Sequence, residues 1–141
     1  MIDNLVLSAA QKVLALQVEM QKLPQVDLSV SHHFGGGIYA RELFIPKGVT
    51  LTGKVHKFEN MNILTKGKML IYTGDESRVL EAPAIVVAAA GSKKAGVALE
   101  DSIWVTLCST DETDPEVIEA EFTLDDMTLL ETQHPLELEG N

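Results

Sequence analysis

Apolar residues in the first 24 positions recur at steps of three or four, which places them on one side of a helix. This stripe and the residues that widen it are Leu5, Ala9, Val13, Leu16, Met20 and Leu23, with Val6, Ala10 and Leu14. Asp3 or Asn4 can cap the helix and Pro24 ends it, so we predict an N-terminal amphipathic helix in residues 1–24 that runs to about Lys22. The stripe needs a cover, and either the rest of the chain or a second subunit can supply one.

From residue 26 the pattern changes to short apolar runs separated by turn residues, which is typical of sandwiches and barrels. The predicted strands are 27–31, 38–44, 50–57, 61–65, 68–73, 78–81, 84–89, 96–99 and 102–107. Glycines such as Gly48, Gly67 and Gly91 mark turns between them. No helix-length pattern interrupts the series, so no βαβ unit is expected. We therefore predict a mainly β fold in which residues 25–110 form a single antiparallel jelly-roll barrel.

Residues 111–141 combine many acidic residues with scattered apolar ones, and they are too apolar for a simple solvated tail. Asp114, Pro115 and Glu116 are typical of a helix start, because proline fits the first turn and carboxylates favour the N-terminus. The helical run that could follow is short and reaches about Ala120. We expect an extended segment from Thr123 onward, and we regard residues 111–141 as an acidic C-terminal arm.

The charges are distributed unevenly along the chain. Residues 1–94 carry 11 basic and 8 acidic side chains, a balance of +3, whereas residues 95–141 carry 13 acidic and no basic ones, a balance of −13. This asymmetry disfavours nucleic acid as a partner. It leaves two alternatives for the acidic part, which are contact with a basic partner and solvation alone.

Composition disfavours further classes of protein. No apolar run approaches about 20 residues, so no membrane partner is expected, and no basic region followed by an apolar one indicates a secretory signal. The single cysteine, Cys108, cannot form an internal disulfide. It lies in a strand-like run, where we expect a small buried residue rather than a nucleophile. A reducing cytoplasm is the expected place of synthesis.

The stretch from Gly48 to Gly67, GVTLTGKVHKFENMNILTKG, resembles the first metal-binding motif of cupins: Gly, five residues, His-x-His, three or four residues, Glu, six residues, Gly. Both glycines and His56 are in place, but Lys54 stands at the first histidine and Asn60 at the glutamate. Alternate residues of a strand share a face, which is why the motif needs His-x-His. A protonated lysine has no lone pair for a metal, and asparagine offers only a neutral carbonyl. The resemblance implies a cupin-like barrel without an intact metal site.

The second cupin motif, aligned on Gly91, places Lys94 at the third histidine and retains little else. We therefore predict no metal, no cofactor and no catalytic residue. The positions that remain form a vestigial cupin pocket of Lys54, His56, Asn60 and Lys94. A rescued metal site of His56, Glu59 and His32 remains an alternative, although Glu59 requires a bulge because a one-residue slip turns a side chain to the other face. His33 points away from His32 on any strand.

Longer stretches resemble a family of small cupin-like proteins with an RmlC-type jelly roll from tailed bacteriophages. The resemblance covers residues 32–114, and its pieces are 39–42, 53–57, 62–64, 82–83 and 98–104. It implies the same barrel and a bacteriophage origin. It implies little about the role of the protein.

A barrel without its metal ligands, an apolar helix and a partly apolar acidic arm are typical of a protein that assembles with others. We therefore expect a non-enzymatic structural protein of a tailed-phage virion, such as a head decoration, collar or neck component, assembled in the host cytoplasm. Its expected partners are further copies of itself and other virion proteins, contacted through the N-terminal helix and the C-terminal arm. Two alternatives remain open. One is a metal-dependent cupin enzyme acting on a small carbohydrate or acid, and the other is a small-molecule-binding module with Lys54, Lys94 or Arg78 facing an anion.

Overall fold

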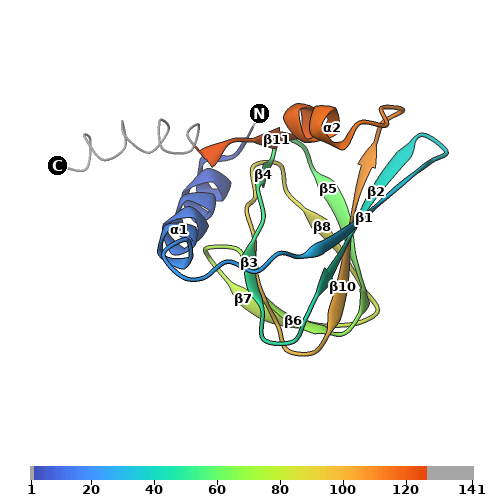
Figure 1. Cartoon of the computed structure of the whole chain (residues 1–141). Coiled ribbons are helices and arrows are strands. Elements are labelled where there is room, and N and C mark those ends of the chain that lie inside the picture. The colour runs from blue at the N-terminus through green and yellow to red at the C-terminus, as the bar shows by residue number, and fades with distance from the viewer. Residues whose placement is uncertain (1, 127–141) are drawn as a thin grey trace.

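The computed structural model describes residues 2–126, which form a jelly-roll barrel of two antiparallel sheets with one helix beside it and another across one end (Figure 1). The five-stranded sheet has the order β1 (Ser29–Gly35), β2 (Ile38–Ile45), β10 (Ser102–Ser109), β5 (Asn60–Lys66) and β8 (Ala84–Ala88). The four-stranded sheet has the order β3 (Thr50–Thr52), β9 (Ala95–Ala98), β6 (Lys68–Tyr72) and β7 (Ser77–Glu81). A two-stranded ladder joins β4 (Val55–His56) to β11 (Thr123–Leu124). The predicted mainly β jelly roll is confirmed.

The core lies between the two sheets, because alternate residues of each strand point inward. Its buried members are Leu43, Ile45, Leu64, Met69, Ile71 and Ala98. Gly67 turns the chain from the first sheet into the second with φ +89°, and a side chain there would collide with Asp101 and Ser102. This geometry explains why the motif glycine is kept where the metal ligands are not.

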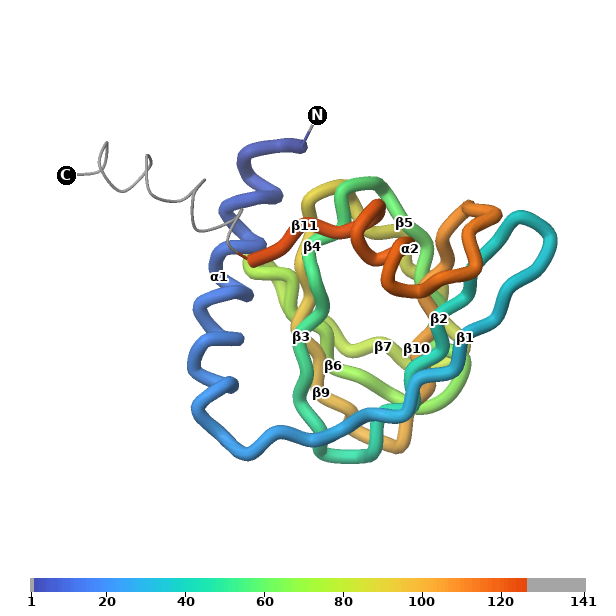
Figure 2. The backbone as a smooth tube through the Cα atoms, turned by 45° about the horizontal axis from the view of Figure 1, so that its top comes forward, coloured from blue at the N-terminus to red at the C-terminus, as the bar shows by residue number. Residues whose placement is uncertain are grey.

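Helix α1 (Asn4–Met20) begins where predicted, with Asp3 accepting a hydrogen bond from the backbone N–H of Leu5 at 2.7 Å. It ends at Met20, two residues before the predicted end. Its buried residues are Ala9, Ala10, Val13 and Leu14, so this chain's own barrel covers the middle of the stripe, whereas Leu16 and Leu23 are exposed (Figure 2). The buried face is rotated from the predicted one, since Leu5 is exposed and Leu14 packs on Val55.

Most strand boundaries differ from the prediction by one or two residues, and two places differ more. Strand β1 continues to Gly35 instead of ending at Ser31, and a tight turn at residues 36–37 leads into β2. The predicted strand 50–57 is divided into β3 and β4, because the chain changes partner from β9 to β11 around Gly53. Sequence periodicity does not report such a change of partner.

Helix α2 (Pro115–Phe122) begins as predicted, with the Asp114 carboxylate accepting from the N–H of Glu116 at 3.0 Å, and ends two residues beyond the predicted end. It lies across one end of the barrel, and Ile118 is 2% exposed (Figures 1 and 2). The chain is extended at Thr123 and Leu124, where β11 pairs with β4 and holds this part of the arm to the barrel. Asp126 is helical, so the extended segment predicted from Thr123 onward is shorter than expected. The remainder of the predicted arm, including His134, lies outside the described residues.

A partly buried polar chain connects the C-terminal segment to α1 and to the barrel. The Lys93 ammonium lies 3.1 Å from Oδ1 of Asp126, and Gln17 Nε2 donates to Oδ2 of Asp126 at 2.7 Å. Thr52 Oγ1 in turn donates to Gln17 Oε1 at 2.8 Å. Among residues 2–126 no helix has the length and apolar character needed to cross a bilayer.

Candidate ligand-binding cavity

A cavity of about 640 Å³ lies in the barrel and is lined in part by α2. Its floor is apolar and consists of Leu43, Ile45, Leu51, Met69 and Ile71. Its walls carry polar side chains, namely His32, Tyr39, Arg41, His56, Asn62, Lys94, Trp104 and Thr106. Pro115, Ile118, Glu119 and Phe122 contribute from α2 and the turn before it. The cavity therefore lies between both sheets, and a segment from the acidic C-terminal arm covers part of its opening.

Strand alternation positions the side chains of the cavity. On β2 the odd-numbered residues Tyr39 and Arg41 continue the inward face of Leu43, and His32 on β1 lies opposite Arg41 in the ladder. On β10 the inward residues are the even-numbered ones, including Trp104. The alternation of β2 was the sequence signal that could have identified Arg41, which was quoted in the family resemblance without a role.

Asn62 is the polar centre of the five-stranded sheet's inner face. Its side chain is 1% exposed, and its Oδ1 accepts from Trp104 Nε1 at 3.2 Å and from Thr106 Oγ1 at 2.8 Å. Its Nδ2 donates to Oδ1 of Asn60 at 2.7 Å. All these groups are hydrogen-bonded, so the network holds the indole and hydroxyl in fixed positions.

Asn60, the residue at the position of the cupin glutamate, does not line the cavity. It lies at the start of β5, where its Nδ2 donates to the carbonyl of Phe58 at 3.2 Å and its Oδ1 accepts from Asn62. Of the four predicted pocket residues, Lys54, His56 and Lys94 line the cavity, and Asn62 occupies the place expected of Asn60.

His56 and Lys94 share the cavity in unusual protonation states. Burial, with Lys94 and Arg41 nearby, lowers the pKa of His56 to about 4, so the imidazole is neutral at pH 7 and only a weak base. Burial lowers the pKa of Lys94 to about 8, so its ammonium remains mostly charged at pH 7. In the part of the chain that the structure describes, no carboxylate forms an ion pair with Lys94 or Arg41. The cavity therefore contains positive charge that these residues do not neutralise.

An aromatic wall borders these charges. The ring of Tyr39 stacks between His32 and Phe34, with centroid distances of 5.8 and 5.1 Å, and a 2.6 Å hydrogen bond joins its hydroxyl to Nδ1 of His32. Burial raises the pKa of Tyr39, so the phenol is neutral. His33 is on the opposite face, where Nε2 lies 3.0 Å from Glu42. The expectation that His33 points away from His32 is confirmed.

The donor set does not fit a divalent metal. His32 and His56 line the cavity, but Glu59 is exposed and does not reach it, so the alternative site of these three residues is not assembled. Within residues 2–126 no group of three His, Cys, Asp or Glu side chains could hold a metal ion. The ammonium of Lys94 also disfavours a cation beside His56. No chemistry is therefore assigned here to a bound metal.

Cys108 lines the cavity instead of being packed in the core, and it is half-buried. Burial raises the pKa of its thiol, which keeps the sulfur protonated at pH 7. This agrees with the expectation that Cys108 is not an activated nucleophile.

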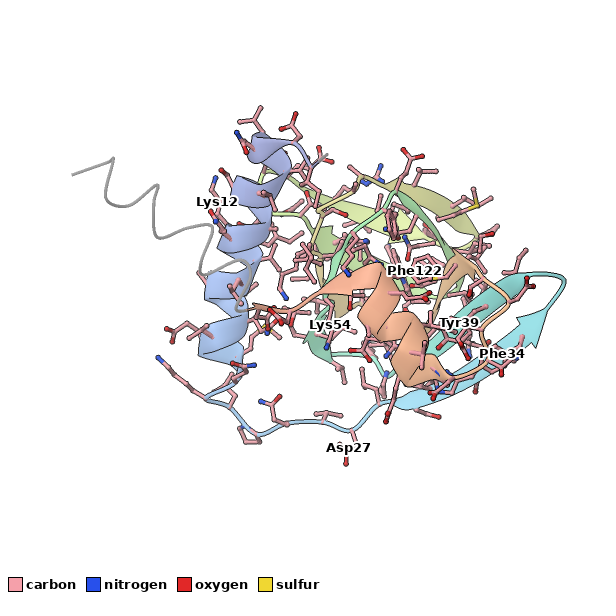
Figure 3. The ribbon with its side chains drawn as sticks, turned by 90° about the horizontal axis from the view of Figure 1, so that it is seen from above. Lys12, Asp27, Phe34, Tyr39, Lys54 and Phe122 are labelled. Atoms are coloured by element: carbon pink, nitrogen blue, oxygen red, sulfur yellow. The ribbon has the colours of Figure 1, made fainter. Side chains whose placement is uncertain are left out.

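Contacts between α2 and the β4–β5 region narrow the cavity mouth. Lys54 lies at the rim rather than in the interior, where its ammonium forms an ion pair with Glu119 of α2 (Figure 3). Lys57 donates to the carbonyl of Ala120 at 3.2 Å, and the rings of Phe58 and Phe122 meet edge to face at 5.7 Å. The sequence predicted a helix here but carried no signal for the surface on which it packs.

Arg78, the third residue proposed from sequence to face an anion, lies outside this cavity. It lines a smaller hollow of about 200 Å³ beside Val6 and Ala9 of α1. Lys94 lines this hollow too, together with Asp75 and Glu76. In the larger cavity the cationic residues are Lys94 and Arg41, with Lys54 at the rim.

Comparison with protein-family models finds no match to this chain, and comparison with curated protein sequences finds none either. Solved structures do match its fold. A cupin superfamily protein from Desulfitobacterium hafniense superposes with a TM-score of 0.51 at 9% identity, over 63% of this chain and 83% of that protein. KdgF from Halomonas sp. has a TM-score of 0.50 at 17% identity, with coverages of 62% and 87%. A conserved protein of unknown function from Streptococcus pyogenes has a TM-score of 0.50 at 15% identity, with coverages of 64% and 80%.

At these identities the likeness concerns the fold alone. The matches do not identify a bacteriophage family, so the phage origin stays a prediction. The fold has two antiparallel sheets with a helix before them, and the matches to solved structures indicate the same fold. The chain has the cupin jelly-roll fold.

Proposed function

We propose that this protein binds a small organic anion in the barrel cavity and does so without a metal ion. The observation that carries the proposal is Lys94, whose largely buried side chain lines the cavity and forms no ion pair with a carboxylate of residues 2–126. A buried charge without a partner is unfavourable, and the lowered pKa of Lys94 records this cost. A bound anion would supply the missing partner.

The other groups of the cavity favour an anion that has an oxygen-rich end and an apolar or ring-shaped body. Arg41 offers a planar fork of N–H donors suited to a carboxylate or phosphate. Tyr39 and Trp104 offer aromatic surface, and the floor is aliphatic. The volume of about 640 Å³ lies within the roughly 300–1,000 Å³ of typical small-molecule sites.

The test is a thermal-shift and calorimetric screen of the full chain against small carboxylates and phosphorylated metabolites. At a hundred times its Kd, a specific ligand adds about 2.7 kcal/mol to the free energy of unfolding. We expect Lys94→Met, which removes the charge at similar length, to abolish this gain. Lys12→Met is the matched control, because Lys12 is an exposed lysine of α1. No stabilisation by any anion, or full stabilisation of Lys94→Met, would overturn the proposal.

A structural role in a tailed-phage virion is a second proposal, favoured by one observation. The outer face of the five-stranded sheet is apolar and exposed, with Ile85 on β8 68% exposed. Such a face is typical of proteins that assemble. Mass spectrometry of purified particles tests this role, with a fixed copy number as the expected result and absence from the particles as the contrary one.

A further inference from the structure

Two lysines that are adjacent in the sequence have different surroundings in the fold. Lys93 is 1% exposed, does not line the larger cavity, and has its ammonium 3.1 Å from Oδ1 of Asp126. Lys94, directly before β9, lines that cavity with a largely buried side chain. Within residues 2–126 its nitrogen has neither an ion pair nor a hydrogen bond. Lys93 is therefore a structural cation, whereas the nitrogen of Lys94 is available to a ligand.

Lys94 lines both hollows of the barrel, and the electrostatics show on which side its nitrogen lies. Asp75 and Glu76 border the smaller hollow, but neither carboxylate raises the pKa of Lys94, which burial alone lowers. In the larger cavity, by contrast, the charge of Lys94 lowers the pKa of His56. The nitrogen therefore lies on the side of His56, in the larger cavity.

Burial makes the nitrogen of Lys94 more reactive than that of an exposed lysine. Only the neutral amine has a lone pair that can attack a carbonyl carbon, and enzymes activate lysines for this reaction by desolvation. A pKa of about 8 instead of 10.5 makes the neutral amine about 300-fold more abundant at pH 7. Lys94 therefore combines access to the cavity with a substantial fraction of free amine.

Arg41 supplies a second cation that cannot take this role. It lines the same cavity from β2, and its charge acts on His56 together with that of Lys94, so the three side chains are neighbours. A guanidinium stays protonated and binds a carboxylate through two parallel N–H donors. A ligand whose carboxylate is on Arg41 presents its adjoining atoms to Lys94. The pair therefore suits a molecule that carries both a carboxylate and a carbonyl group.

We propose that Lys94 captures an oxo acid covalently, as an imine between its side-chain nitrogen and the carbonyl carbon, while Arg41 holds the carboxylate. The inference rests on the proposed function, because it names the class of anion that the cavity binds. The aliphatic floor and the ring of Tyr39 suit an apolar or aromatic group on the other side of the carbonyl.

The atoms of this step balance without any further reactant. The ammonium of Lys94 releases one proton, and the neutral nitrogen then forms a bond to the carbonyl carbon. The bond from that carbon to oxygen breaks, and the oxygen leaves as water with two of the three hydrogens that the ammonium carried. The nitrogen keeps the third hydrogen and the positive charge as an iminium. Charge pairing with the carboxylate therefore persists after capture.

The experiment is reductive trapping on the full chain. Pyruvate or phenylpyruvate is added near pH 8, the pKa of Lys94, and sodium borohydride then reduces any imine to a stable secondary amine. We expect a single adduct whose mass is that of the oxo acid less one oxygen atom. Tandem mass spectrometry should place it on Lys94 and not on the adjoining Lys93 or on the exposed Lys12.

Two variants separate capture from simple binding. Lys94→Arg keeps a positive charge but has no amine that forms an imine, so we expect loss of the adduct. It should still be stabilised by phenyllactate, a hydroxy acid that has the carboxylate and the ring but no carbonyl. Lys12→Met is the matched control and should be labelled like the wild type. Circular dichroism verifies that both variants are folded.

No adduct with either oxo acid would overturn the proposal, and so would labelling spread evenly over exposed lysines or retained in Lys94→Arg. The wild-type peptide map alone decides this, whatever the stability of the variants. Stabilisation of the wild type by phenyllactate without any adduct from the oxo acids would remove the imine and leave anion binding intact. No stabilisation and no adduct with any of these acids would count against both.

Discussion

Lys94 connects the stability of the barrel to its proposed function. Two opposing requirements meet in this one side chain, because burial disfavours the charge that an anion needs. The pKa of the neighbouring His56 is also lowered, to about 4, by burial and by the charges of Lys94 and Arg41. Hydrogen-bonded Asn62, in contrast, contributes a rigid neutral wall. The cavity thus combines a charged group whose burial is unfavourable with neutral groups whose hydrogen bonds are satisfied.

We predict that Lys94→Met raises the stability of the ligand-free protein near pH 7 by about 1 to 3 kcal/mol. The pKa of Lys94 is about 8 in the folded state and 10.5 in the unfolded chain. Between pH 8 and pH 10.5 the unfolded chain therefore binds more protons than the folded one. Wild-type stability should therefore rise with pH from about 8 to 10.5, and this rise should be missing in Lys94→Met. Denaturant unfolding across pH 7 to 10.5 measures both effects.

Lys12→Met is the control, because its lysine is exposed on α1. A generally destabilising substitution would lower stability at every pH, so a gain that fades above pH 8 is specific to a buried ammonium. A wild-type curve identical to that of Lys94→Met would contradict the assignment.

Helix α2 is the element that converts an open barrel into a covered cavity. It is short, so its propensity alone does not hold it in place, and its stability comes from packing. Ile118 of α2 is buried, and Lys54, Lys57 and Phe58 at the cavity mouth contact the helix. The surface ion pair of Lys54 and Glu119 contributes little alone, since exposed pairs are worth about 0 to 1 kcal/mol. Apolar contact therefore decides whether the cover stays closed.

We predict that Ile118→Ala loosens α2 while the two sheets remain intact. Loss of a buried isoleucine side chain costs about 2 to 5 kcal/mol, which corresponds to at least about thirty-fold faster exchange of the α2 amides by local opening. Hydrogen exchange followed by mass spectrometry measures this. Val117→Ala on the exposed side of the same helix should change exchange little. Equal acceleration in α2 and in the core strands would show that the whole barrel, rather than its cover, depends on Ile118.

At the scale of the whole molecule, a polar chain joins parts that are far apart in sequence. Lys93, Asp126, Gln17 and Thr52 connect the turn before β9, the C-terminal segment, α1 and β3. Lys93 is 1% exposed, and burial lowers its pKa while Asp126 raises it. The ion pair with Asp126 therefore opposes the loss of charge that burial favours. The hydrogen bond from Gln17 to Asp126 holds the C-terminal segment against α1.

We predict that Asp126→Asn destabilises the fold by about 1 to 3 kcal/mol, because it leaves Lys93 buried without its counter-charge. Adding Lys93→Met should recover much of the loss, since an apolar pair of similar size avoids the desolvation of two charges. A double-mutant cycle by denaturant unfolding measures the coupling. Additive losses in the double variant would show that the two residues act separately.

Local structure could largely be predicted from the sequence. The cap at Asp3, the start of α2 at Pro115 and most strand centres depend on neighbours within a few residues, and the structure agrees with them. The split between β3 and β4 and the rotation of α1 could not be predicted, because both depend on which distant segment the chain meets.

The same division applies to the cavity. Spacing of the cupin glycines placed His56 and Lys94 in one pocket, and the chemistry of lysine argued against a metal there. It placed Asn60 there as well, whereas Asn62, two residues further along β5, has that role. A motif locates a position to within about two residues of a strand. The start of the strand pairing then decides which of two residues on the same face reaches the interior.

The sequence by itself determined the jelly-roll class, the two helix starts and the loss of the cupin ligands, because periodicity, capping and donor chemistry are local properties. Only the tertiary structure decided that Arg41 and Lys94 face one cavity, that α2 covers it and that the outer face stays open. The reason is physical. Pairing of strands that are distant in sequence brings these residues together. The contacts that stabilise this pairing join distant segments, so no short stretch of sequence specifies them.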